Sequence, residues 1–461
     1  MTADRTSRIY SGASPDQVAA DLEPLVRFQE EGLSLEEVTD LIEEKLVPHL
    51  GRYELPSFHF LFNSAPEAGA EVGAQIAVRH NQGVTNWQVS PGGAVLEEMC
   101  CKALCHLFGL GAGSDATIMY CGTYANQQAI YMALDRHAER CGFKLAESGV
   151  QGFRDPSSLA VVCSEDVHFS LKHAVRMLGL GESCLVPVAN DSNCRIDVHA
   201  LREKLREMRE GEGGRGKREV FCIVATTGTT STGAVDPVPP IADICEKLGA
   251  WLHVDGAYGL AYKLVPDWSH LFDGVERADS ITWDPHKQMG VPIPSSVLFV
   301  RHSADFRRVT LYSSYWNRED AVEPNPGVKS IPTTRPMTVL PLVTSIRHQG
   351  LSGVIKRLSA PLNAITQLAD YVTDQSDLEL CHSPDTGILC FRVIPTDVAA
   401  TQLDELQTHV YDTLLREGQR PVSISQIGGK TVLRLVAISP LVTAADMIDT
   451  VNRAREVAGS Q

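Results

Sequence analysis

The feature that most constrains the fold of this chain is a regular alternation of short apolar runs with longer segments of helical periodicity. Strands that alternate with helices form a mainly parallel sheet with helices on both faces. The predicted strands are residues 159–163, 184–188, 220–225, 251–254, 280–283 and 296–300. Ligands of such sheets bind beyond the carboxyl ends of the strands, and several polar motifs of this chain fall at those ends.

Three regions of different pattern follow one another along the 461 residues. Residues 1–63 contain a helical arm that begins at Ser14-Pro15, followed by an irregular, aromatic-rich segment. Residues 64–345 carry the alternating pattern and form the predicted large domain. Residues 346–461 change to helices and shorter strands, which predicts a small C-terminal α+β domain. A chain of this length exceeds one core of typical size, so a large domain with a smaller companion is expected.

Composition excludes several classes of partner. The formal net charge of −16 argues against nucleic acid and anionic membranes, since both repel such a surface, and favours a small-molecule substrate. The sequence shows no secretory signal ahead of its twelve cysteines, and these cysteines lie largely in apolar patterns. Both observations are typical of reduced thiols in a cytoplasmic protein. No run approaches the roughly 18 apolar residues that span a bilayer. No metal site is predicted, because CxxC, HExxH and EF-hand spacings are missing from the sequence.

Two motifs carry residues with a specific chemistry, His253–Gly259 (HVDGAYG) and Trp283–Lys287 (WDPHK). A lysine amine forms an imine with an aldehyde, and a carboxylate keeps a pyridine nitrogen protonated. These are the groups that an enzyme supplies to pyridoxal phosphate (PLP), which makes Lys287 and Asp255 candidates. Ala257 shares the strand face of Asp255 and could lie against the ring. Taken singly, Lys287 could be a surface lysine and Asp255 a helix cap or turn residue.

Two segments rich in Gly, Ser and Thr are candidates for holding the phosphate. Backbone N–H groups at a helix N-terminus favour an anion, and Gly122 and Thr123 precede the helical run at 127–135. The second segment, residues 226–233, follows a predicted strand and contains Thr230. Most such loops are ordinary turns, so each alone is a weak signal.

Two histidines are further candidates. His168 follows the strand at 159–163 and could lie flat on the exposed face of the ring and contact the substrate carboxylate. His286 precedes Lys287 and could touch the phosphate or the substrate. An isolated histidine is more often a polar packing residue.

In order and spacing these segments resemble the group II PLP-dependent amino-acid decarboxylases, which include glutamate, aromatic amino-acid, histidine and cysteine-sulfinate decarboxylases. The resemblance covers roughly residues 55–455 and extends to the segments YCGTYAN, SEDVHFSLKHA, ATTGTTSTGAVD and TVLRLVAISP. It implies PLP-dependent transferase fold type I (the aspartate aminotransferase superfamily), whose large domain has a mainly parallel sheet of the seven-stranded type. It also implies a homodimer in which the N-terminal arm wraps the partner.

The resemblance assigns roles by position. It implies that Lys287, His168 and Asp255 are catalytic, with Lys287 forming the Schiff base in the decarboxylation of an L-amino acid to an amine and carbon dioxide. The residues that it assigns to the cofactor are Lys287, Asp255, Ala257, His168, Gly122, Thr123 and Thr230, and His286 beside the lysine is a further candidate for cofactor binding. Asp284 stands where many relatives have asparagine, and we expect it to cap the turn or pair with a cation.

The loop before Arg335 departs from the family pattern. Relatives usually carry there a mobile tyrosine that reprotonates the α-carbon after carbon dioxide leaves, and counting back from Arg335 places it at Pro324, with Tyr312 and Tyr315 nearby. Without that tyrosine the carbanionic intermediate survives longer and can be diverted to oxygen with release of an aldehyde. Decarboxylation coupled to oxidative deamination, or another PLP-dependent carbon–carbon cleavage, is therefore the alternative expectation.

The sequence gives conflicting indications of the substrate. Arg434 resembles the arginine that reads a carboxylate in glutamate decarboxylases, although the aromatic branch has a similarly placed arginine. Phe60 and Leu61 stand where the glutamate branch has a polar pair, and an apolar wall favours an aromatic or aliphatic side chain. The choice between acidic and apolar substrates stays open.

Overall fold

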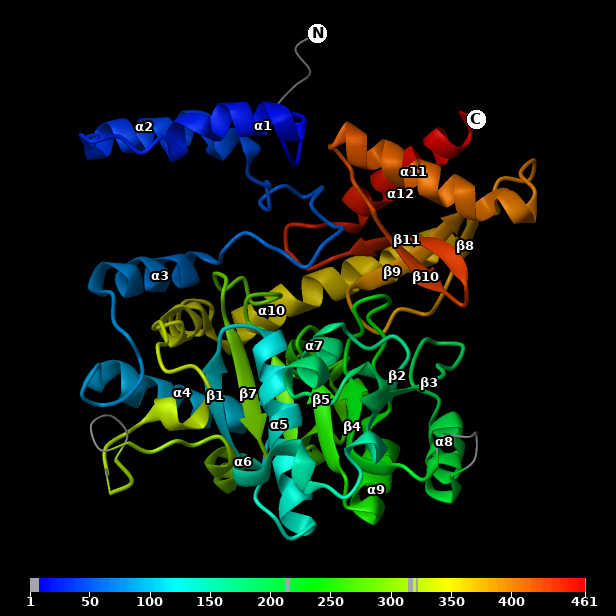
Figure 1. Ribbon diagram of the computed structural model, residues 1–461. Coiled ribbons are helices and arrows are strands. Elements are labelled where there is room, and N and C mark those ends of the chain that lie inside the picture. Colours follow the sequence, from blue (N-terminus) through cyan, green and yellow to red (C-terminus); the bar gives the residue numbers. More distant parts are fainter. Residues whose placement is uncertain (1–7, 212–215, 314–317, 321, 461) are drawn as a thin grey trace. The chain divides into compact units, whose positions relative to one another are not determined.

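The protein is described here by a computed structural model that covers residues 8–211, 216–313, 318–320 and 322–460 (Figure 1). The chain forms two compact units. The small unit comprises Met1–Ala65, Ala360–Cys381 and Gly387–Gln461, and the large unit comprises Pro66–Ser359 and His382–Thr386. The sequence predicted divisions after residues 63 and 345, whereas the second division of the structure falls after residue 359, within a helix.

The large unit is built on a sheet of seven strands in the order β1-β7-β6-β5-β4-β2-β3. The strands are β1 Asp115–Met119, β2 Leu159–Ser164, β3 Leu185–Val188, β4 Glu219–Thr226, β5 Trp251–Asp255, β6 Ser280–Trp283 and β7 Ser296–Val300. Pairs among β2 to β6 are parallel, and β7 runs antiparallel to both of its neighbours. The predicted α/β fold with a mainly parallel sheet is confirmed.

Helices follow most of these strands. The helices of the large unit are α3 Ala68–His80, α4 Pro91–Leu107, α5 Gly122–Arg140, α6 Leu145–Ser148, α7 Ser170–Met177, α8 Val198–Glu210 and α9 Val238–Leu248. Helix α5 lies against β1 and β4 to β7, while α9 lies against β4 and β5. A further helix, α10 Val339–Thr373, is interrupted at Gly350, whose φ of 63° is left-handed. It extends from the large unit into the small one.

Short 3-10 helices lie in the connections. They are Glu23–Val26, Val47–His49, Gly149–Gly152, Pro156–Ser158, Glu182–Cys184, Gly259–Leu264, Ser269–Phe272, Val275–Arg277, Ser303–Arg308, Pro326–Lys329 and Ala400–Gln402.

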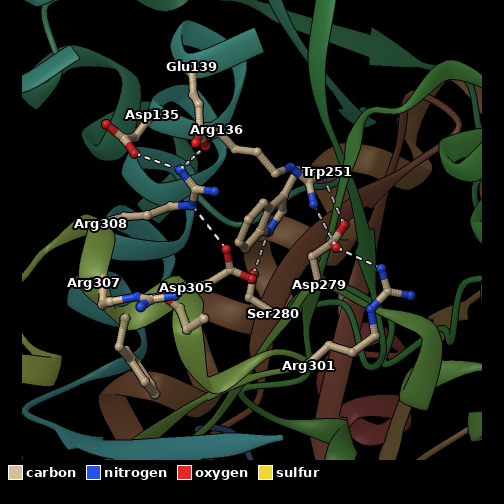
Figure 2. Close-up of polar contacts among 12 residues, drawn as sticks. Asp135, Arg136, Glu139, Trp251, Asp279, Ser280, Arg301, Asp305, Arg307 and Arg308 are labelled. Atoms are coloured by element: carbon tan, nitrogen blue, oxygen red, sulfur yellow. Dashed lines mark hydrogen bonds and ion pairs between the residues drawn. The ribbon is translucent and has the colours of Figure 1, made fainter. Parts of the chain in front are cut away.

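The face of β5 that meets α5 positions the polar residues of the site. Successive side chains of a strand point to opposite faces, so Trp251, His253 and Asp255 share one face. Trp251 is fully buried in a core cluster that includes α5 residues. The guanidinium of Arg136 on α5 lies 4.4 Å from the centre of the Trp251 ring and pairs with Asp279 (Figure 2). Aromatic packing and ion pairing therefore fix α5 against β5.

The small unit contains an antiparallel sheet of four strands in the order β10-β11-β9-β8. The strands are β8 Leu378–Leu380, β9 Ile388–Val393, β10 Ser423–Ile427 and β11 Lys430–Val436, and they are accompanied by α11 Leu403–Glu417 and α12 Ala444–Ala458. Apolar residues of the sheet, of both helices and of the end of α10 form one core cluster. The predicted small α+β domain is confirmed.

The N-terminal part of the small unit forms the predicted helical arm. Helices α1 Pro15–Leu22 and α2 Leu35–Lys45 each begin with a capping box, Ser14 with Gln17 and Ser34 with Glu37. None of the residues within these two helices is buried. Across the described residues, every helix is too short or too polar to cross a membrane.

Candidate active site

Lys287 lies in a tight turn that follows β6. Its backbone N–H donates to the Asp284 carbonyl at 3.0 Å, and its Nζ is 3.3 Å from Asp284 Oδ2. The Asp284 side chain is buried, and its second oxygen, Oδ1, accepts no hydrogen bond from the described residues. Asp284 therefore pairs with a cation, as the sequence suggested, and holds one end of the Lys287 side chain.

Asp255 ends β5 at the carboxyl edge of the sheet. Its Oδ1 accepts from the Ala257 N–H at 3.1 Å, and its Oδ2 accepts from Asn126 Nδ2 at 2.8 Å. The parallel register places Asp255 between Thr226 of β4 and Thr282 of β6. Both of those threonine hydroxyls are buried and lack a hydrogen-bond partner among the described residues. Asp255 is thus an oriented carboxylate between two unsatisfied polar groups.

Helix α5 begins at Gly122, close to both elements just described. A Cβ at Gly122 would lie 2.9 Å from Asp284 Oδ2 and 3.3 Å from the Ala257 Cβ. The N-cap residue, Cys121, accepts no hydrogen bond through its side chain within the described chain. The first N–H groups of α5, those of Gly122 and Thr123 among them, are therefore available to an anion.

His168 and His286 are both neutral near pH 7, because burial lowers the pKa of each below its usual value. His168 Nδ1 accepts from the Ser170 N–H at 3.2 Å, and Asp255 and Lys287 are close enough to influence its pKa in opposite directions. His286 hydrogen-bonds through Nδ1 to the Ser295 carbonyl, and its Nε2 is 3.7 Å from Asp284 Oδ2. Both predicted histidines therefore lie in the neighbourhood of Lys287.

The loop that carries Thr230 begins beside Asp255. The Thr227 N–H donates to the Asp255 carbonyl at 2.9 Å, and the loop closes through a bridge between Thr227 and Val235. Gly228 has a left-handed φ of 106°, and a Cβ there would lie 2.9 Å from the Gly259 nitrogen. Thr230 is half-buried at the tip of this loop.

Three further site residues were not predicted from the sequence: Asn126, Ser170 and His253. Asn126 Nδ2 donates to both Asp255 Oδ2 and Ser170 Oγ, and His253 contacts Asn126 Oδ1. A signal was present, since Asn126 lies one helical turn after Gly122 and His253 lies two residues before Asp255 on the same strand face. Strand β5 ends at Asp255, so the alternation of the strand relates Asp255 to His253, whereas Ala257 lies in the turn that follows the strand.

The predicted substrate residues belong to the small unit. Arg434 is buried, donates through Nε to Ser423 Oγ at 2.8 Å, and its guanidinium lies 5.4 Å from the centre of the Phe62 ring. Phe60 is buried in a small apolar cluster with Ile9 and Phe58, whereas Leu61 is 39% exposed. Their contact with substrate stays a prediction.

The segment around Pro324 is anchored on its C-terminal side. Gly327 donates to the Thr85 carbonyl at 2.7 Å, and Thr310 Oγ1 donates to the Val328 carbonyl at 2.9 Å. Tyr312 is 52% exposed. Tyr315 lies outside the described residues.

Two other features lie away from this constellation. A cavity of about 780 Å³ is lined by residues of α5 and of the 303–308 helix, such as Tyr131 and Arg308, and its described lining contains none of the predicted cofactor residues. His137, Cys141 and Glu219 form a group that could hold a metal ion. A hydrogen bond of 3.3 Å between His137 Nε2 and the Glu219 carboxylate accounts for that group equally well.

The residues at the carboxyl edge of the sheet fit PLP. They offer an amine, a carboxylate held by N–H donors, unsatisfied hydroxyls and an uncapped helix N-terminus with a glycine at its start. Residues 15–394 match the pyridoxal-dependent decarboxylase conserved domain. The chain belongs to this family. The predictions of family, cofactor and reaction class are confirmed, and the protein is a PLP-dependent amino-acid decarboxylase.

Relatives of this decarboxylase act on different amino acids. An L-2,4-diaminobutyrate decarboxylase of Rhizobium meliloti (strain 1021) is 28% identical over 100% of this chain and 89% of its own. An aromatic-L-amino-acid decarboxylase of Bacillus atrophaeus is 26% identical over 81% of this chain and 75% of its own. The crystal structure of mouse CSAD superposes with a TM-score of 0.88 at 23% identity, covering 99% of this chain and 94% of that one, which supports the fold.

Proposed function

We propose that this decarboxylase binds its cofactor through Lys287, with Asp255 at the pyridine nitrogen. The remaining assignments are Ala257 and His168 on the two ring faces, and Gly122, Thr123, Thr230 and His286 around the phosphate. The observation that carries the proposal is the meeting of Lys287, Asp284, Asp255 and the start of α5 at one edge of the sheet. When bound, PLP supplies an electron sink for the carbanion left by loss of carbon dioxide.

The residues of the chain have separate tasks in this reaction. Lys287 is the nucleophile that holds the cofactor and releases it to the substrate amine, and Asp284 Oδ2, 3.3 Å from Nζ, orients the lysine side chain. Asp255 keeps the ring nitrogen protonated, and its two N–H donors hold the carboxylate in one orientation. Neutral His168 offers a flat imidazole to the ring and a hydrogen bond to the substrate.

Borohydride reduction followed by peptide mass mapping tests the lysine assignment. Reduction makes the bond between cofactor and lysine permanent, so we expect the added mass on the peptide that contains Lys287. Lys287→Ala should lose both the label and the amine product. Lys329, another half-buried lysine, serves as the control because it is paired with Glu98 and Asp115. A label on any lysine other than Lys287 contradicts the assignment.

We propose an amine as the main product. The aldehyde-forming alternative rests on Pro324, which stands where relatives carry the reprotonating tyrosine. Products from a single purified preparation, analysed for amine, aldehyde, ammonia and peroxide, separate the two outcomes. If aldehyde and peroxide form in proportion to carbon dioxide, the enzyme catalyses the oxidative reaction and not simple decarboxylation.

The first substrate to test is L-2,4-diaminobutyrate, since the relative that covers the whole chain carries that name. An equimolar mixture that also contains glutamate, cysteine sulfinate, tyrosine and tryptophan places the side-chain classes in direct competition. We expect one class to be consumed first, and mass spectrometry identifies it. Preferential loss of an acidic amino acid would favour a role for Arg434, and loss of an aromatic one would favour Phe60 and Leu61.

We also propose that the enzyme is a cytoplasmic homodimer whose N-terminal arm packs on the partner. Large apolar side chains of the arm are exposed, with Phe28 at 94% and Leu35 at 87%, and such a surface favours burial against a second copy. Buried cysteines of the large unit, such as Cys163 and Cys222, carry free thiols, as in a reducing compartment. In sedimentation analysis, Phe28→Asp with Leu35→Asp should yield monomer, whereas Leu248→Asp, an exposed leucine of α9, should not. A dimer of unchanged affinity would exclude the arm as the contact.

A further inference from the structure

A continuous chain of hydrogen bonds runs behind the Asp255 carboxylate along one face of β5. Trp251 Nε1 donates to Ser280 Oγ at 2.8 Å, the contact drawn in Figure 2. Ser280 Oγ lies 2.9 Å from His253 Nδ1, and His253 Nε2 lies 3.0 Å from Asn126 Oδ1. Asn126 Nδ2 then donates to Asp255 Oδ2 at 2.8 Å. All five side chains are buried, with at most 6% exposure.

The direction of this chain is fixed by its two ends. An indole N–H can only donate, and an ionised carboxylate can only accept. Ser280 accepts from Trp251, so its own proton is available to His253 Nδ1, and His253 then carries its proton on Nε2. The Asn126 amide can only present its oxygen to His253, because turning it would aim that oxygen at the Asp255 carboxylate. Every link therefore donates toward Asp255.

The charge of His253 is fixed as well. Burial lowers the pKa of His253 to about 4, so the imidazole is neutral near pH 7. A neutral imidazole with the proton on Nε2 has one donor and one acceptor, and both are used in the chain. His253 is therefore a fixed connector between Ser280 and Asn126 and not a second cation beside the carboxylate.

Asn126 is the branch point of the network. Its second N–H donates to Ser170 Oγ at 2.9 Å, and the Ser170 backbone N–H donates to His168 Nδ1 at 3.2 Å. One amide thus connects Asp255, assigned to the ring nitrogen, with His168, the histidine assigned to a ring face. The far end of the chain is held by Arg136, which stacks on Trp251 and pairs with Asp279 (Figure 2).

We propose that Asn126 and His253 are positioning residues that set the orientation of the Asp255 carboxylate and, through Ser170, of the His168 ring. Removal of His253 frees the Asn126 amide to rotate, and rotation withdraws the N–H that Asp255 Oδ2 accepts. This inference rests on the assignment of Asp255 to the cofactor nitrogen made above.

The test compares cofactor binding by the apoenzyme of several variants. His253→Leu breaks the chain, and His253→Gln keeps an amide N–H close to the position of Nε2. Ser280→Ala removes the donor that fixes the tautomer, and Ser296→Ala is its matched control, since Ser296 is equally buried but donates only to the Trp283 carbonyl. The measurements are the PLP dissociation constant from absorbance titration, the visible circular dichroism of bound PLP, and the melting temperature of the apoenzyme.

We expect His253→Leu to weaken PLP binding by about tenfold, the effect of one buried hydrogen bond, and to change the visible circular dichroism. His253→Gln should restore most of both. Ser280→Ala should change the PLP affinity and the circular dichroism in the same direction as His253→Leu, but by less. Ser296→Ala should change neither. If His253→Leu does not fold, the comparison of Ser280→Ala with Ser296→Ala decides the question.

Three results overturn the inference, and they are distinguishable. If Asp255→Ala weakens PLP binding strongly while His253→Leu and Ser280→Ala bind PLP as the wild type does, the network has only a structural role. If Asp255→Ala itself binds PLP with unchanged affinity and circular dichroism, the assignment of Asp255 fails and the inference falls with it. A fall in melting temperature shared by His253→Leu and His253→Gln, without any change in cofactor binding, also assigns the network to stability alone.

Discussion

Replacement of Arg335 by methionine should destabilise the large unit by an amount that depends on pH. The Arg335 guanidinium is buried and donates to Glu97, to the Thr117 hydroxyl at 3.3 Å and to the Ile118 carbonyl at 2.8 Å. Through its own carbonyl, Arg335 accepts from the Val84 N–H at 2.7 Å. Arg335 therefore ties the end of the loop that contains Pro324 to strand β1.

The size of the predicted loss of stability depends on whether the Glu97 carboxylate takes up a proton. Glu97 is fully buried; desolvation raises its pKa, and Arg335 opposes that rise. Removal of one partner from a buried ion pair typically costs about 3–5 kcal/mol. Glu97 can limit this cost by taking up a proton, and protonation of a carboxyl with the ordinary glutamate pKa of about 4.3 costs about 3.7 kcal/mol at pH 7, at roughly 1.4 kcal/mol per pH unit. We therefore expect Arg335→Met to lose about 3–4 kcal/mol at pH 7.

The sign of the pH dependence follows from proton uptake. In Arg335→Met the folded state keeps Glu97 protonated at pH 7, whereas the unfolded state has it ionised. The folded state then binds one more proton, so stability rises as pH falls from 7 toward the ordinary pKa of glutamate. The reverse variant, Glu97→Met, leaves a guanidinium that cannot deprotonate, so its loss should be larger and nearly independent of pH.

Urea denaturation of the apoenzyme between pH 5 and 7, followed by circular dichroism, measures these losses. The double variant Arg335→Met/Glu97→Met is the control, because replacing both partners with apolar residues of similar size typically restores most of the stability. The reasoning is refuted if Arg335→Met is as stable as the wild type at pH 7. It is also refuted if the difference in free energy of unfolding between the wild type and Arg335→Met is the same at pH 5 as at pH 7.

Three further predictions concern other parts of the chain. Burial lowers the pKa of His59 to about 4 from its ordinary 6.5, so between these pH values the unfolded state binds more protons and stability is lost as pH falls. The denaturation midpoint of His59→Gln should therefore depend less on pH in this range than that of the wild type. An equal pH dependence of the two midpoints would contradict this. Gly122→Ala should weaken PLP binding about tenfold or more, since the added Cβ would lie 2.9 Å from Asp284 Oδ2 and overpacking costs roughly 1–3 kcal/mol. An absorbance titration that gives an unchanged PLP affinity would disprove the close approach of Gly122 to Asp284. Of the twelve cysteines, exposed Cys141 should react first with a thiol reagent in the native protein, as peptide mapping can establish, and earlier labelling of buried Cys222 would contradict the packing.

The sheet of the large unit was predictable from the sequence where strands are continuously apolar. The apolar runs at 159–163 and 220–225 lie within β2 and β4, because strands buried on both faces need no polar residue. Strand β1 was not predicted. It begins with Asp115, a buried carboxylate that is neutralised by Lys329 at 2.8 Å, and that partner lies more than two hundred residues away in the sequence. A local pattern cannot contain a charge partner that only the fold supplies.

The same distinction separates the parts of the proposed active site. Lys287 and Asp255 could be proposed from the sequence because each lies in a contiguous motif, and a contiguous motif can be recognised in a single sequence. The partners of Asp255 come from other elements: Asn126 from α5 and, through His253, Ser280 from β6. Their residue types were visible, but their pairing depends on the register of β5 with β6, in which His253 stands opposite Ser280. Register in a parallel sheet is set by packing of both faces and not by a turn, so a sequence pattern leaves it undetermined.

Register also decides the chemistry of His253. A shift of one residue would place Ile281 opposite His253 and send the Ser280 side chain away from it, since neighbouring residues of a strand face opposite sides. His253 Nδ1 would then lose its donor, and nothing would select the tautomer that donates to Asn126. In the proposed network, the orientation of the Asp255 carboxylate thus depends on strand pairing at the amino end of β6, whereas Lys287 follows the carboxyl end of that strand. Ser280 has no proposed contact with substrate or cofactor, but its hydroxyl determines which His253 nitrogen carries the proton. Ser280 therefore belongs to the proposed site.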